Sequence, residues 1–171
     1  MKIKLLLFAY LGLIGCSVAL AASADNIDSP VKVTFMEPEN FTDLKTAYMD
    51  TDRGREALVA ELKRHILARA ARYLTTGQRL EITITDVDLA GDFEPWQRDN
   101  LQDVRIVKDI YPPRVTLQFR LLDGDGAVLS EGTRQLLDLG YMMNLAWPMS
   151  DPLRYDKEML STWLRREFKH S

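Results

Sequence analysis

Two stretches of the sequence carry residue types that could do chemistry, and the first is acidic. The segment DVDLAGDFE places four carboxylates within nine residues: Asp86, Asp88, Asp92 and Glu94. Hard cations such as Ca²⁺ prefer several converging carboxylate oxygens, so this cluster is a candidate divalent-metal site. Its spacing differs from that of the EF-hand loop, in which the glycine and the distal glutamate have fixed places. The alternative is a strand end whose carboxylates are exposed to solvent.

The second stretch is soft and aromatic. The segments FEPWQRDN and YMMNLAWPM fall in predicted loops, and they hold side chains suited to contact with a partner or an apolar ligand. These candidate partner-binding residues are Trp96, Tyr141, Met142, Met143, Trp147 and Met149. The alternative is that YMMNLAWPM covers an open end of the core. Methionine thioethers can also bind Cu(I), but the segment has no repeated methionine motif and no nearby histidine.

The residues that common enzyme mechanisms require are scarce. The chain has two histidines, and neither His65 nor His170 lies beside a serine motif; G-x-S-x-G is absent. There is no His-x-x-x-His or Cys-x-x-Cys spacing for zinc and no glycine-rich phosphate loop. The sequence therefore favours a protein that is not an enzyme and has no cofactor, although carboxylate pairs leave the question open.

Alternating apolar residues predict the strands. VKVTF, RLEITITDV and RVTLQFRLL alternate cleanly, and AVLSEGTRQLLDL returns after the turn DGDG as the second strand of a hairpin. VRIVKDI, within a long excursion over residues 90–113, adds a short strand. In an uninterrupted strand, Asp86 and Asp88 would point to the same face as the apolar residues Ile82 and Ile84. Either the strand bulges near 86, or it ends there and the carboxylates leave the core.

Two helices are predicted from residues at helical spacing. The first runs from Arg53 to Leu74, with Asp52 as its N-cap. The second occupies residues 151–170, with Asp151 as N-cap and Pro152 at the first helical position. The order of elements predicts an α+β domain of two layers, a mostly antiparallel sheet of about four strands with two helices packed on it.

The N-terminus is typical of an export signal. Lys2 and Lys4 precede an apolar run that is shorter than the roughly 20 residues that span a bilayer. One interpretation cleaves after Ala21, giving a signal over residues 1–21. The other takes LIGC as a bacterial lipobox, with Cys16 lipidated after removal of residues 1–15. We expect a periplasmic protein, either free or tethered to the outer membrane through Cys16.

The composition of the chain after the leader indicates its domain organisation and the kinds of partner it can have. Residues 22–30 are small and polar and indicate a linker, and residues 31–171 a single domain. Because the leader carries two lysines and no acid, removing it changes the net charge from −3 to −5, which argues against nucleic-acid binding. A sequon at residues 40–42 would suit a eukaryotic secreted protein, but a single cysteine cannot form an internal disulfide. The bacterial envelope is favoured, with the membrane reached only through a lipid anchor.

Several stretches resemble a known family. VTFMEPENFTD, LEITITDVDLAGDFEPW, IYPPRVTLQFRLLDGDGAVLSEG and LRYDKEMLSTWL occur in this order over about residues 31–168. They are similar to a family of exported proteobacterial proteins catalogued only as a domain of unknown function. The resemblance implies a periplasm-facing domain, in some members a lipoprotein, and it supplies no activity and no catalytic residues.

The functional expectation is therefore an uncharacterised envelope protein. We expect a non-enzymatic domain that binds an envelope protein or a small ligand through its exposed aromatic and methionine loops. The alternative is a divalent-metal-binding or metal-dependent protein that uses the acidic cluster.

Overall fold

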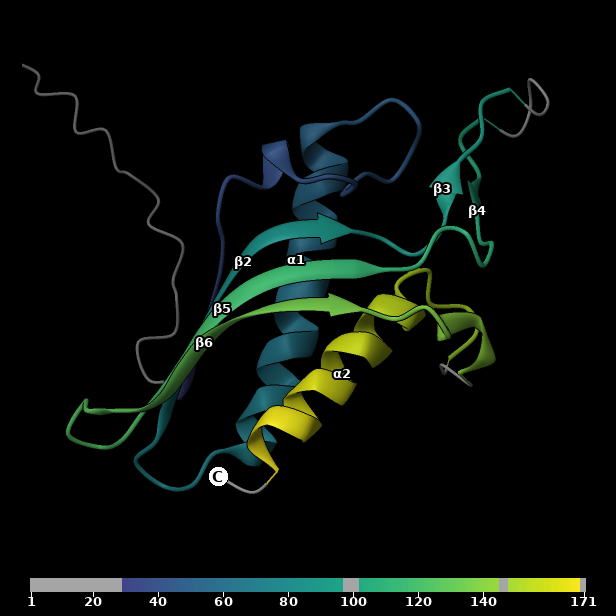
Figure 1. Cartoon of the computed structure of the whole chain (residues 1–171). Helices are drawn as coiled ribbons and strands as arrows, with labels where there is room; N and C mark the ends of the chain where they lie inside the picture. Colours follow the sequence, from purple (N-terminus) through teal and green to yellow (C-terminus); the bar gives the residue numbers. More distant parts are fainter. Residues whose placement is uncertain (1–28, 97–101, 145–147, 170–171) are drawn as a thin grey trace, which may run out of the picture.

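A four-stranded mixed sheet carries two helices on one face. The computed structural model describes residues 29–96, 102–144 and 148–169 (Figure 1). The strand order is β1-β2-β5-β6. β1 and β2 pair in parallel, and the other neighbouring strands pair antiparallel. The strands are β1 (Val31–Phe35), β2 (Arg79–Asp88), β5 (Arg114–Leu122) and β6 (Val128–Leu137). The α+β prediction is confirmed.

A second, two-stranded sheet lies in the excursion between β2 and β5. Its strands are β3 (Asp92–Phe93) and β4 (Arg105–Ile106), paired antiparallel. The sequence pattern predicted a short strand around β4 but missed β3. Gly91, which precedes β3, has a φ of +80°. A Cβ there would lie 2.7 Å from the carbonyl oxygen of Ile106, so only glycine allows this close approach of the two chain segments.

The core lies between the sheet and the helices, as the alternation predicted. One face of each of β1, β2 and β5 is buried against α1 (Asp52–Ala70) and α2 (Arg154–Phe168). Phe119 makes edge-to-face contacts with Trp163 and Phe168 of α2, with ring centroids 6.1 and 5.4 Å apart. Contacts of this kind add about 0.5–1.5 kcal/mol each to the free energy of burial.

The strand phase changes once in β2. The register with β5 shifts between Ile84 and Asp86. After this bulge Val87 faces the core and is buried, which turns Asp86 and Asp88 to the open face of the sheet. The sequence left two alternatives, a bulge near residue 86 or a strand that ends there, and the structure has the bulge.

Both helix starts differ from the prediction. The N-cap of α1 is Thr51, whose hydroxyl accepts a hydrogen bond from the Gly54 backbone, so Asp52 is the first helical residue. The N-cap of α2 is Leu153. Asp151 instead accepts from the Leu153 backbone at 2.9 Å and caps the turn before the helix. Helix boundaries vary by one or two residues in this way, and sequence spacing alone does not resolve them.

Three connecting segments leave the sheet at the same end. Phe35 pairs with Ile84 in parallel, Asp88 pairs with Arg114, and Arg114 pairs with Leu137. The chain therefore exits β1, β2 and β6 and enters β5 at one end, where the second sheet and the segment before α2 also lie (Figure 1). We call residues 36–51, 89–113 and 138–153 the loop end. The opposite end carries the turn between β5 and β6.

Candidate functional site

The loop end holds ten of the thirteen large apolar side chains that are exposed among the described residues. Trp96, Met143 and Met149 are 72%, 89% and 73% exposed. The other exposed apolar residues of the three segments are Met36, Tyr48, Met49, Val104, Ile110, Leu139 and Met142. Apolar side chains that gather on a surface rather than scatter over it mark interaction sites. The two loops singled out from the sequence thus lie at one end of the fold.

One of the predicted partner-binding residues, Tyr141, is not part of this surface. Tyr141 is 1% exposed and packs edge-to-face on Tyr155, with ring centroids 4.9 Å apart. Its ring belongs to the core, so the expectation that it is exposed is corrected. Trp147 lies outside the described residues. The remaining four, Trp96, Met142, Met143 and Met149, are exposed as the partner-binding interpretation requires.

Arg105 ties two segments of the loop end together. Its guanidinium donates to both carboxylate oxygens of Asp43, at 2.7 and 3.1 Å, and to the backbone carbonyls of Gly91 and Lys45. The guanidinium carbon also lies 4.6 Å from the centre of the Phe93 ring. Asp43 is buried, and a bidentate pair of this kind fixes orientation as well as distance.

A second set of contacts joins the excursion to the segment after β6. Tyr141 donates its hydroxyl hydrogen to the carbonyl of Lys108 at 2.6 Å. The ammonium of Lys108 donates to Glu94, a buried carboxylate, at 2.6 and 2.8 Å. Tyr111 also donates to Glu94, and this hydrogen bond raises the pKa of the Tyr111 hydroxyl. Partly buried ion pairs and hydrogen bonds therefore hold together the chain segments that carry the exposed side chains. We call these contacts the base of the loop end.

A third contact fixes the excursion to α2. Asp156 is 1% exposed, and its Oδ1 accepts from the Ala90 backbone at 3.0 Å. Its Oδ2 has no hydrogen-bond partner within the part of the chain that the structure describes. Burial raises the pKa of the Asp156 carboxyl to about 7, with Asp43 adding to the effect and Arg105 opposing it.

The predicted metal ligands are engaged separately. Asp86 accepts from the backbone and hydroxyl of Thr42, at 2.8 and 2.9 Å. Asp92 accepts from the adjacent Phe93 backbone, whereas Glu94 binds Lys108. Burial, and then the charge of Asp43, raises the pKa of Asp88. Within residues 29–96, 102–144 and 148–169, no three acidic, histidine or cysteine side chains converge as a metal site needs.

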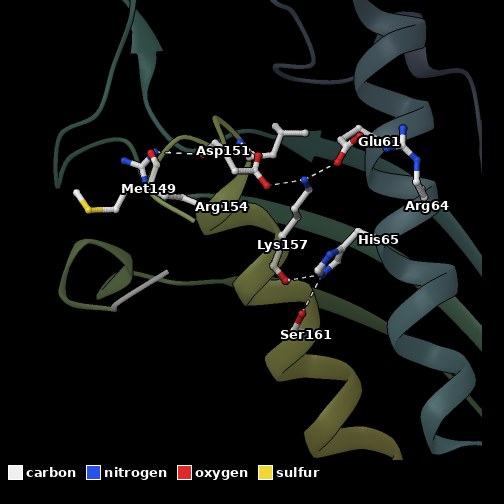
Figure 2. A network of polar contacts seen from close by, with 9 residues as sticks. Glu61, Arg64, His65, Met149, Asp151, Arg154, Lys157 and Ser161 are labelled. Atoms are coloured by element: carbon white, nitrogen blue, oxygen red, sulfur yellow. Dashed lines mark hydrogen bonds and ion pairs between the residues drawn. The ribbon is translucent and has the colours of Figure 1, made fainter. Parts of the chain in front are cut away.

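A histidine and a serine meet between the two helices, a contact that the sequence spacing did not reveal. His65 Nε2 lies 2.8 Å from Ser161 Oγ and 3.0 Å from the Lys157 carbonyl oxygen (Figure 2). The two side chains are 96 positions apart, and no local motif links residues at that separation. Nearby, the Lys157 ammonium donates to Glu61 and Asp151, each at 2.6 Å.

This pair has the geometry of a helix contact rather than of a nucleophile and its base. Burial lowers the pKa of His65 and so favours the neutral ring. A carbonyl oxygen only accepts hydrogen bonds, so Nε2 carries the proton that points toward Lys157. A protonated Nε2 cannot accept the Ser161 proton as a general base must. The network joins α1 to α2 and supplies no activated serine.

Comparison with known proteins assigns the chain to a family but gives no activity, ligand or partner. A family model described as "Protein of unknown function (DUF3016)" matches residues 29–166, so the chain belongs to this family. Neither a curated protein nor a solved structure matches it. Among the described residues, no helix has the length and apolarity needed to cross a membrane.

Proposed function

We propose that this family member is a non-enzymatic interaction domain of the bacterial envelope that binds a partner protein through the loop end. The observation that carries the proposal is that three chain segments at one end of the fold, joined by the contacts of Arg105, Tyr141 and Asp156, expose large apolar side chains. The partner would offer an apolar surface for Trp96 and the methionines. The leader, whether removed or retained as a lipid anchor on Cys16, would deliver the domain to the periplasm.

The exposure of these side chains argues against a purely structural role. The core beneath the loop end is already closed by buried side chains, among them Leu44, Phe93, Tyr141 and Leu153. Trp96 and Met143 therefore add little to the free energy of folding where they stand. Large aromatic and methionine side chains of this kind dominate the energetics of interfaces once they are desolvated.

The rigid mounting of the loops favours binding as well. A loop that is already ordered loses little conformational entropy when it meets a partner. The contacts of Arg105, Tyr141 and Asp156 order the described part of the excursion in the free protein. Polar side chains around the apolar ones, such as Lys108 and Asn144, would form the hydrated rim of the interface.

The double variant Trp96→Ser, Met143→Ser is expected to lose its partner and keep its fold. Because both side chains are exposed, we expect its Tm to stay within about 1–2 °C of the wild type. Recovery of the specific partner with tagged protein from the native host should fall at least tenfold, measured by quantitative mass spectrometry. Gln118→Ser, on the exposed open face of the sheet, is the matched control. Equal recovery with both variants would contradict the proposal.

A further inference from the structure

β6 is a long strand at the edge of the sheet (Figure 1). It spans ten residues, Val128–Leu137, and within the described residues it pairs only with β5. Such an edge presents unpaired N–H and C=O groups to any strand that approaches it. Monomeric proteins usually protect a long edge with proline, lysine or other outward charges.

The edge of β6 lacks this protection. The strand VLSEGTRQLL contains neither proline nor lysine. Its two charged side chains are turned back onto their own chain. Arg134 lies over the Phe119 ring and binds both carboxylate oxygens of Glu167, at 2.9 and 2.6 Å. Glu131 lies 3.4 Å from Arg120 of the neighbouring strand. Val128, Leu129 and Leu137 are exposed at the two ends.

A groove of about 710 Å³ lies between α2 and the C-terminal end of β6, residues 135–137. Met159, Trp163 and Leu136 supply its apolar lining, and side chains such as Glu158, Thr162 and Arg166 supply polar groups. No lining residue comes from β5 or α1, so the groove lies at the outer rim of the two layers. A strand added to β6 would set its helix-facing side chains over this groove.

We propose that the occupant of this edge is a second copy of the chain, with the two β6 strands paired antiparallel about a twofold axis at Thr133. In this register Glu131 faces Gln135 of the partner, and Gly132 faces Arg134. Like charges never lie opposite each other, as stable cross-strand pairing requires. The joined sheet has eight strands, counting four from each copy.

The ends of the strand also match under this symmetry. Leu137 of one copy lies at the end of the partner strand that carries Val128 and Leu129. That end runs alongside residues 136–138 and therefore over the groove. The exposed apolar side chains of each copy are buried by the other, which is the self-complementarity that a twofold interface needs. A foreign extended segment would have no reason to match this pattern of polar centre and apolar ends.

The test is a symmetric disulfide in the full chain. With Cys16→Ser, the variant Thr133→Cys carries the only thiol, and the twofold axis brings the two sulfurs together. We expect most of the oxidised protein to be a covalent dimer. Gln118→Cys, on the open face of β5, should stay largely monomeric under the same oxidation. Covalent dimers that form equally at both positions, or at neither, would overturn the proposal.

A second measurement keeps the test independent of cysteine chemistry. Light scattering coupled to size exclusion should give the dimer mass for the wild type. Leu137→Lys, at a half-exposed position, should raise the dimer dissociation constant at least about tenfold with an unchanged circular dichroism spectrum. A wild type that is monomeric at all concentrations would overturn the proposal. So would a monomer whose β6 edge binds only a foreign extended peptide.

Discussion

Replacing Arg105 with alanine is expected to lower the free energy of unfolding by about 3–5 kcal/mol, because it leaves the buried Asp43 carboxylate without its partner. Asp43 is 7% exposed, so water cannot replace the lost guanidinium. The backbone carbonyls of Gly91 and Lys45 lose their donor as well. The measurement is urea denaturation at pH 7.

The variant should also loosen the excursion locally. Amide hydrogen exchange over residues 89–96 and 102–113 should accelerate more than exchange in the central strands β2 and β5. Arg120→Ala is the matched control. Its contacts to Glu81 and Glu131, at 3.5 and 3.4 Å, are exposed, so we expect a change within about 1 kcal/mol. Equal effects of the two variants would show that Arg105 does not organise the loop end.

Asp156→Asn should remove a pH dependence from folding stability. Burial holds the Asp156 pKa at about 7, above its ordinary 3.8. Between these two pH values the folded chain keeps a proton that the unfolded chain has released. The free energy of unfolding therefore falls as the pH rises through this window. A pKa difference of this size between the unfolded and the folded chain changes the free energy of unfolding by roughly 4 kcal/mol over this pH window.

Asparagine imitates the protonated acid, with an oxygen that can still accept from Ala90. The variant should match the wild type near pH 4 and become more stable than the wild type by about 2–4 kcal/mol at pH 8. Other carboxylates also contribute to the pH profile, and taking the difference between the two proteins removes them. Asp109→Asn, at an exposed position of the same excursion, should stay within about 0.5 kcal/mol of wild type at each pH. A constant difference between Asp156→Asn and the wild type across this pH range would contradict the assignment.

The strands and helices were predictable because their signal is local. Alternation in β2 and β5 and the helical spacing of Leu160, Leu164 and Phe168 follow from burial of one face. The bulge in β2 was one of two alternatives, because unbroken alternation would have pointed Asp86 into the core. The exact helix starts were not predictable: Thr51 caps α1 in place of the adjacent Asp52, and α2 begins after Leu153, which supplies no side-chain cap.

The base of the loop end was not predictable from the sequence. Arg105 and Asp43 are 62 positions apart, and nothing in either segment indicates the other. Tyr141 sits in the same apolar stretch as Met142 and Met143, and its burial depends on Tyr155 and on the Lys108 carbonyl. The carboxylates of Asp86, Asp88, Asp92 and Glu94 are close in sequence, but the bulge in β2 and the second sheet direct them to different partners.

The most direct test of the account is site-specific photo-crosslinking in the native host. A photoreactive phenylalanine analogue would replace Trp96, Ile110 or Met143 at the loop end, and Gln118 of β5 or Ala68 of α1, two exposed positions elsewhere on the molecule. We expect the same discrete adduct from the three loop-end positions and its absence from the other two. Adducts of equal yield from both sets of positions, or none from the loop end, would contradict the claim that this end is the contact surface.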